Sequence, residues 1–271
     1  MSGPATARSY LFVPGNRPER FQKAHQSGAD RVILDLEDAV AEADKDAARQ
    51  KVGEYLQAGG TGIVRINATE GRWLADVLAC NQPGLQGVIL PKSESAAAVA
   101  RVVEQLPATV RVLPLIETAR GMKQLDEIAM APGVERLVFG TVDFRTELGI
   151  EGDDEELLYF RSMLVLASKA ARIAAPVDGV TVAIQDADEL QRASVRARRL
   201  GFGAKLCIHP SQVEGVNQAF RPSAQQLAWA EKVVGMARTS PGAFQLDGEM
   251  VDAPVIARAV DLLRQAGRPA G

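Results

Sequence analysis

Short apolar runs alternate with longer amphipathic stretches eight times along this chain, and that alternation constrains the fold more than any other feature. The predicted strands are Ser9–Val13, Arg31–Leu34, Gly62–Ile66, Gly87–Leu90, Val110–Ile116, Val134–Phe139, Val180–Val182 and Ala204–Ile208. Strands that are apolar on both faces are typical of parallel sheets covered by helices. Eight such units predict an α/β fold, the (β/α)8 TIM barrel. A doubly wound sheet is the alternative, but its usual GxGxxG turn is absent after the first strand.

We predict a barrel over residues 1–221 and a C-terminal segment over residues 222–271. In that segment Pro222–Arg238 is predicted as a helix, Thr239–Asp252 is polar and contains glycine, and a last helix runs from Asp252-Ala253-Pro254 to Leu263. About fifty residues are too few for an independent domain. The segment is therefore predicted to be a helical lid or an oligomer arm.

Composition excludes several classes of partner. The chain has 271 residues and a net charge of −3, so it lacks the strongly basic field that nucleic acids select. No apolar run has the length of a membrane span, and no apolar segment follows Met1 as in a signal peptide. The two cysteines, Cys80 and Cys207, are far apart and fit buried thiols of a cytoplasmic protein.

Polar residues recur at or just beyond the ends of the predicted strands. They are Asp35, Glu37, Asp38, Arg65, Asn67, Lys92, Glu117, Thr118, Asp143 and His209. In a closed barrel the carboxyl ends of all strands meet at one face, where the active sites of such barrels lie. The barrel prediction therefore gathers these side chains into one cleft.

Several acids in one cleft repel one another unless a cation binds between them. With only two histidines in the chain, oxygen ligands and Mg²⁺ are favoured over a zinc site, and Mn²⁺ is possible. We predict Glu117 and Asp143 as the metal ligands. The alternative for either acid is a helix cap or an ion pair with an arginine. Asp35, Glu37 and Asp38 either hold metal-bound water from the second shell or form an acidic helix start.

Basic residues near the same face suggest anion contacts. Arg65, at the end of a buried strand, suits a substrate carboxylate, or an ion pair with Asp35 to Asp38, or both. Arg17 and Lys23 could bind phosphates or simply cover an exposed helix face. Lys92 and Lys205 keep Schiff-base chemistry open, whereas GxSxG, GxxxxGK[ST] and HExxH motifs are absent.

Seven segments resemble the citrate lyase β-subunit family, within the HpcH/HpaI aldolase and citrate lyase superfamily. They are Ser9–Ala24 (SYLFVPGNRPERFQKA), Ile33–Val40 (ILDLEDAV), Val64–Asn67 (VRIN), Leu113–Gly121 (LPLIETARG), Phe139–Phe144 (FGTVDF), Lys205–Val213 (KLCIHPSQV) and Asp247–Val255 (DGEMVDAPV). They occur in order over nearly the whole chain, so the series is far more specific than any single motif.

The resemblance implies a Mg²⁺-dependent carbon–carbon lyase that cleaves 3-hydroxyacyl-CoA thioesters such as citryl-, malyl- or citramalyl-CoA, with CoA as part of the substrate. It implies Glu117 and Asp143 as metal ligands and Arg65 as the contact to the substrate carboxylate and oxyanion. It also implies Asp252 as the acid/base that reaches a neighbouring subunit's active site, and a homotrimer or hexamer. A helix cap is the alternative role for Asp252.

Three other functions remain open. The chain could be a citrate lyase subunit that acts on an acyl-carrier-protein thioester, or an aldolase on free 2-oxo acids. It could also bind the metal without turnover, because ligands alone do not establish catalysis.

Overall fold

The computed structural model describes residues 7–239 and 242–268, and eight parallel strands close into a barrel in sequence order. The strands are β1 (Ser9–Pro14), β2 (Arg31–Asp35), β3 (Gly62–Arg65), β4 (Leu85–Leu90), β5 (Arg111–Ile116), β6 (Val138–Phe139), β7 (Val177–Asp178) and β8 (Ala204–Cys207). β1 pairs with β8 in the register Ser9↔Lys205 and Tyr10↔Leu206, which closes the sheet. The predicted TIM barrel is confirmed.

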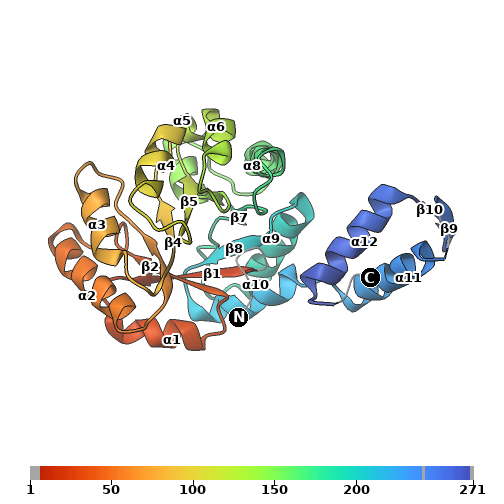
Figure 1. Ribbon diagram of the computed structural model, residues 1–271, viewed down its shortest axis with the longest axis horizontal. Helices are drawn as coiled ribbons and strands as arrows, with labels where there is room; N and C mark the ends of the chain where they lie inside the picture. Colours follow the sequence, from red (N-terminus) through yellow and green to blue (C-terminus); the bar gives the residue numbers. More distant parts are fainter. Residues whose placement is uncertain (1–6, 240–241, 269–271) are drawn as a thin grey trace. The chain divides into compact units, whose positions relative to one another are not determined.

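Helices cover the outside of the barrel, with at least one between most pairs of strands (Figure 1). They are α1 (Phe21–Gln26), α2 (Lys45–Gln57), α3 (Arg72–Cys80), α4 (Ala96–Val103), α5 (Ala119–Lys123), α6 (Leu125–Met130), α7 (Thr141–Leu148), α8 (Leu158–Ala170), α9 (Ala187–Leu200) and α10 (Val213–Phe220). Short 3-10 helices occupy Pro18–Arg20, Glu42–Asp44, Glu155–Leu157 and Pro210–Gln212. No helix in the described part of the chain has the length and hydropathy needed to cross a bilayer.

Two strand predictions were wrong in position. The seventh strand is Val177–Asp178 rather than Val180–Val182, and the sixth keeps only Val138–Phe139 of the predicted Val134–Phe139. Asp178 is a fully buried carboxylate inside a strand, which an apolar pattern cannot anticipate. Val182 instead lies in the following loop with 65% of its surface exposed.

The barrel interior is packed by apolar side chains from every strand. Its buried members are Ala7, Tyr10, Ile33, Ile63, Ile89, Leu113, Leu115, Val138, Val177, Ala204 and Leu206. Both cysteines are buried and free, as predicted, and burial raises the pKa of each thiol to about 12. The interior is therefore packed, and the active site of such a barrel is expected at its carboxyl-terminal rim.

Chain residues 220–271 form a second compact unit. It contains α11 (Ala224–Ala237), β9 (Phe244–Leu246), β10 (Glu249–Val251) and α12 (Ala253–Gln265). The Asp247-Gly248 turn joins the two strands, and both residues have positive φ as a two-residue hairpin turn requires. The stretch predicted only as polar thus contains a hairpin, and the unit has its own apolar core around Val233, Ala259 and Leu263.

Arg136 closes the amino-terminal end of the barrel. It is fully buried and donates hydrogen bonds to the carbonyl of Ala7 (3.1 Å), the hydroxyl of Tyr10 (3.1 Å) and the carbonyl of Ala175 (2.7 Å from Nε). These acceptors come from segments that are far apart in sequence. The guanidinium therefore joins the start of β1 to the segment that leads into β7.

We expect Arg136→Met to lower the free energy of unfolding by about 2–4 kcal/mol, because it leaves buried carbonyls without a donor. Urea unfolding followed by circular dichroism measures the change. The control is Arg192→Met, which removes an exposed arginine paired with Glu189 and should leave the free energy of unfolding nearly unchanged. Equal stability of the two variants would contradict the role given to Arg136.

Candidate active site

A cavity of about 440 Å³ lies at the carboxyl-terminal mouth of the barrel. Its lining includes Asp35, Asp38, Arg65, Glu117 and Asp143. These residues come from β2, β3, β5 and α7 or from the loops that follow the strands. The structure therefore brings together the main acids and the arginine that the sequence predicted for one cleft. Glu37 does not line this cavity, but its carboxylate lies 3.1 Å from Arg65 Nη1.

Glu117 directly follows β5 and is 2% exposed. Its Oε1 accepts a hydrogen bond of 2.8 Å from the backbone N–H of Lys92, which has a left-handed φ of 47°. That conformation is uncommon for a residue with a side chain, and strain of this kind clusters at functional sites. Burial, together with the nearby carboxylates of Glu37 and Asp143, raises the pKa of Glu117 to about 8.

Asp143 lies in the first turn of α7 and is exposed to the cavity. The positive end of the helix dipole favours a negative charge there. α7 starts close to Glu117, because a Cβ on Gly140 would lie 2.6 Å from Glu117 Oε2. Only glycine lets the chain pass the glutamate at this distance. The structure thus places the two predicted metal ligands beside the same turn.

Arg65 is 8% exposed and surrounded by acids. Its Nε and Nη2 donate to the two oxygens of Asp35 at 2.7 and 2.6 Å, and Nη1 donates to Asp38 at 3.1 Å. The ion-pair interpretation of Arg65 is therefore seen directly. A guanidinium has five N–H groups, and these three bonds leave two for another anion.

The three acids at the end of β2 and in the loop that follows differ in their hydrogen bonds and their exposure. Asp35 accepts backbone N–H bonds from Glu37 (2.9 Å) and Ala39 (3.2 Å) besides the two from Arg65, so it fixes the loop. Glu37 is buried, and its Oε2 has no hydrogen-bond partner although Arg65 Nη1 lies 3.1 Å away. Burial raises the pKa of Glu37 to about 7 against the charge of Arg65. Asp38 is the most exposed of the three.

The donors fit a hard divalent cation that keeps water ligands. Among residues 7–239 and 242–268, no three side chains of His, Cys, Asp or Glu form a complete cage. Two carboxylates with open positions suit Mg²⁺, which usually retains several waters. Burial is the main cause of the raised pKa of Glu117, the carboxylates of Glu37 and Asp143 add to it, and a cation beside them would favour the charged form. Glu117 and Asp143 would hold it, and Glu37 could accept from a bound water.

The structure does not favour either lysine for Schiff-base chemistry. Lys205 is fully buried and donates to the carbonyl of Gly179 (2.6 Å) and to Asp178 (3.5 Å). It does not line the cavity. Lys92 has a side chain that is 53% exposed, so it lacks the desolvation that activates such an amine.

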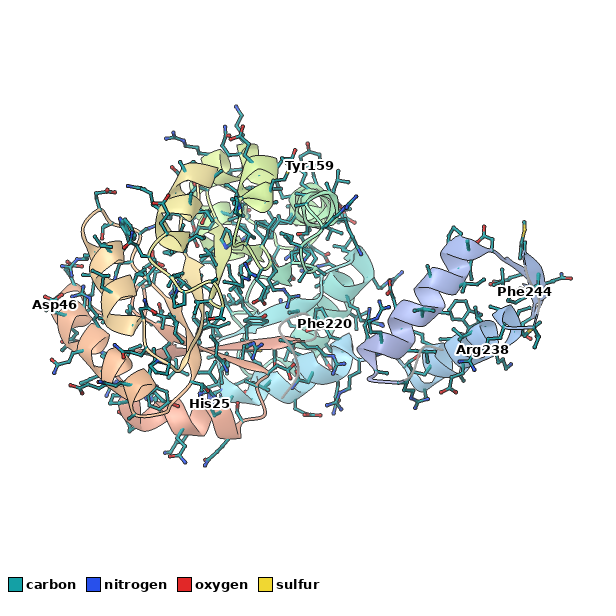
Figure 2. The ribbon with its side chains drawn as sticks, in the orientation of Figure 1. His25, Asp46, Tyr159, Phe220, Arg238 and Phe244 are labelled. Atoms are coloured by element: carbon teal, nitrogen blue, oxygen red, sulfur yellow. The ribbon has the colours of Figure 1, made fainter. Side chains whose placement is uncertain are left out.

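The remaining predicted residues lie apart from the acids. Arg17 and Lys23, near and in α1, are exposed and have no ion pair in the described part of the chain. His209 accepts a hydrogen bond from the backbone N–H of Ser211 at 3.2 Å and caps the helix that follows. His25, labelled on α1 in Figure 2, contacts the carbonyl of Thr61 at 2.8 Å.

Asp252 belongs to the C-terminal unit, where it caps α12. Its Oδ1 accepts a bond of 3.3 Å from the backbone N–H of Val255, and the residue is exposed. The alternative role as a helix cap is therefore present. The capping bond uses only Oδ1, so Oδ2 could accept or donate a proton in a reaction.

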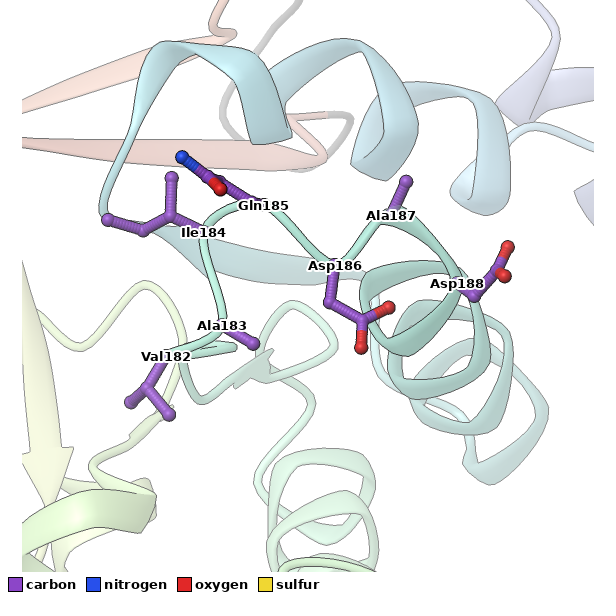
Figure 3. A pocket seen from close by; sticks show the side chains of 7 residues that line it. All are labelled: Val182, Ala183, Ile184, Gln185, Asp186, Ala187 and Asp188. Carbon is purple, nitrogen blue, oxygen red and sulfur yellow. The ribbon is translucent and has the colours of Figure 1, made fainter.

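A larger surface hollow of about 870 Å³ lies along the loop Val182–Asp188 between β7 and α9. Its side chains point in different directions rather than toward one centre (Figure 3). Asp186 is occupied in capping α9, where it accepts from Glu189 N at 2.8 Å. This hollow offers no converging polar groups, so the acid-lined cavity is the better candidate.

Comparison with known proteins decides the family. The profile of the family described as HpcH/HpaI aldolase/citrate lyase matches residues 8–210, most of the chain. The chain belongs to this family. A citrate lyase subunit beta-like protein of Mycobacterium tuberculosis is 40% identical over 272 residues, which cover 97% of each chain. A (3S)-malyl-CoA thioesterase of Cereibacter sphaeroides is 33% identical over 272 residues, 96% of this chain and 94% of its own.

Solved structures of family members agree with the fold. The CitE protein of Mycobacterium tuberculosis, in complex with magnesium, acetoacetate and coenzyme A, aligns with a TM-score of 0.85 at 38% identity. That alignment covers 98% of this chain and 100% of the other. A citrate lyase beta subunit of the same organism, complexed with oxaloacetate and magnesium, aligns with a TM-score of 0.72 at 35% identity, over 82% and 100%. The resemblance noted in the sequence is confirmed, as is membership of a lyase family.

Two residues that contact the acid-bearing segments of the candidate site were not predicted. Lys45 donates to the carbonyls of Leu36 (3.0 Å) and Glu37 (2.9 Å) and to Asn67 (2.6 Å), which holds the acidic loop. Its sequence signal is weak, because one lysine at a helix start is ordinary. Gly140 directly precedes α7, and a glycine between a strand and a helix can indicate a close approach.

Proposed function

We propose that this chain is a Mg²⁺-dependent lyase that cleaves a 3-hydroxyacyl-CoA thioester of the citramalyl, malyl or citryl type into an acyl-CoA and a 2-oxo acid. The observation that carries the proposal is the pair Glu117 and Asp143 beside Arg65 at the barrel mouth. Relatives crystallised with magnesium, coenzyme A and small oxo acids support the ligand classes. Arg17 and Lys23 are proposed contacts for CoA phosphates.

The chain's own groups can perform the parts of such a cleavage. Arg65 is fixed by Asp35, and its two remaining N–H groups would orient the carboxylate of the departing 2-oxo acid. Its fixed charge would stabilise the oxygen that gains negative charge. A bound divalent cation supplies Lewis-acid stabilisation of the alkoxide. Asp252, from a neighbouring subunit of a trimer or hexamer, would accept the proton of the substrate 3-hydroxyl group as the C2–C3 bond breaks, and would return it to C2 of the thioester enolate.

The first experiment identifies reaction and carrier together. The purified chain is incubated with malyl-, citramalyl- and citryl-CoA, with the matching acyl-carrier-protein thioesters and with free 2-oxo acid adducts. Each is tested with and without Mg²⁺, while 2-oxo acid and free thiol are measured separately. A lyase forms oxo acid without free thiol, whereas a thioesterase releases thiol without oxo acid. We expect Mg²⁺-dependent oxo acid from at least one thioester. Turnover of free 2-oxo acid adducts alone, or of carrier-protein thioesters alone, would contradict the proposal.

We expect Glu117→Gln to weaken Mn²⁺ binding by about a hundredfold or more, because a charged ligand contributes several kcal/mol. The glutamine can still accept the N–H of Lys92, so the fold should persist. Electron paramagnetic resonance of free Mn²⁺ measures the affinity. Glu54→Gln, an exposed position on α2, is the control and should bind as the parent does. Unchanged affinity in Glu117→Gln would remove this residue from the metal site.

We expect Asp252→Asn to fold normally and lose turnover, because asparagine caps a helix as well as aspartate but transfers no proton. Asp261→Asn on the same helix is the control and should retain activity. Action between subunits has its own test, in which inactive Asp252→Asn and Glu117→Gln chains are unfolded and refolded together. Recovered activity supports an acid donated across an interface, and its absence contradicts that arrangement.

A further inference from the structure

A buried ionic cluster lies under the β7–β8 side of the barrel mouth. Asp178 on β7 accepts from Arg161 Nε at 2.9 Å, and Lys205 on β8 lies 3.5 Å from its other oxygen. All three side chains are at most 1% exposed. Although burial alone would raise it, Lys205 and Arg161 hold the pKa of Asp178 below its ordinary value. The side chain of Lys205 thus contacts the end of β7 through Asp178.

Lys205 also fixes the backbone directly after β7, because its Nζ donates to the carbonyl of Gly179 at 2.6 Å. The Gly179 peptide in turn donates its N–H to Asp178. Both polar groups at Gly179 are therefore held by the cluster. Buried hydrogen bonds to charged groups are the strong ones, so this peptide has little freedom to move.

Gly179 lies against the start of α7. A Cβ built on Gly179 would lie 2.2 Å from Thr141 Oγ1, 2.6 Å from its Cγ2 and 2.9 Å from its Cβ. Thr141 is 3% exposed and follows Gly140, which passes Glu117 equally closely. The start of α7 therefore contacts Glu117 through Gly140 and Gly179 through Thr141. Asp143 follows two residues later on the same helix.

We propose that Lys205 and Gly179 are positioning residues for the cation site, acting through the Gly140–Thr141 start of α7. Metal ligands bind well only when their geometry is held by surrounding groups to about half an ångström. Loss of the contact would let α7 shift, and the distance from Asp143 to Glu117 would change with it. This inference rests on the proposed metal site and adds the cluster that holds it.

The decisive variant is Gly179→Ala. Rotation of the Thr141 side chain cannot remove the overlap, because its Cβ alone would lie at 2.9 Å, so α7 must move. We expect the dissociation constant for Mn²⁺ to rise by about tenfold or more, as for other residues that orient metal ligands. Thr141→Ala, which cannot clash, should weaken binding severalfold. The double variant removes the two shortest contacts and should bind more tightly than Gly179→Ala.

The matched control is Gly203→Ala at the opposite end of the barrel. A Cβ there would lie 2.6 Å from Arg136 Nη2, so the substitution is equally crowded but far along the strands from the acids. It should lower the melting temperature and leave Mn²⁺ affinity unchanged. Lys205→Met should weaken Mn²⁺ binding, whereas Arg136→Met, which also removes a buried cation, should not.

Parent-like Mn²⁺ affinity in Gly179→Ala, or affinity lost equally in Gly203→Ala, overturns the inference. If Gly179→Ala does not fold, the Thr141→Ala variant tests the inference instead. Mn²⁺ affinity equal to that of the parent in Thr141→Ala would also overturn the inference. The Glu117→Gln variant distinguishes a failure of the proposed metal site from a failure of the positioning role. If that variant binds Mn²⁺ as the parent does, the proposed metal site fails. If it loses binding while the Gly179 and Thr141 variants keep it, only the positioning role fails.

Discussion

Closure of the sheet by the pairing of β1 with β8 is the constraint on which the rest of the molecule depends. It brings the ends of β2, β3 and β5 and the start of α7 around one mouth, so residues separated by about a hundred positions share one cavity. An open sheet with the same elements would spread these ends along an edge. The same closure requires a packed interior, which leaves only the rim for water, substrate and charge.

The mouth of the barrel carries more acidic than basic side chains. Five acids lie there with three basic side chains, Arg65, Lys45 and Lys92. The acids are Asp35, Glu37, Asp38, Glu117 and Asp143. Arg65 neutralises the Asp35 side of the cavity, and Glu117 and Glu37 are left with raised pKa values. Carboxylates this close repel one another, and a divalent cation bound between them would turn the repulsion into attraction. The charges at the mouth therefore support the proposal that a cation binds there.

The sequence predicted the barrel because strand and helix patterns repeat, and repetition averages out local errors. The predicted bounds were wrong for β6 and β7, because each of these strands has only two residues. In β7 the buried Asp178 also interrupts the apolar run. The sequence grouped the acids because each follows a strand end. It could not find the contacts of Gly140 and Gly179, since a close approach depends on segments that meet only in three dimensions. The Asp247-Gly248 hairpin, in contrast, carried a readable signal that the polar composition of its segment obscured.

Burial changes the role that we infer for Lys205. In sequence it is a lysine within the eighth predicted strand of a barrel, and a desolvated lysine is a candidate for Schiff-base chemistry. In the structure its Nζ donates to Asp178 and to the carbonyl of Gly179, and the side chain does not line the cavity. A buried ion pair seldom adds much stability by itself, because desolvation offsets the attraction. What it does provide is a fixed geometry for the end of β7, and the proposed metal site, with only two protein carboxylates, would depend on that geometry more than on stability.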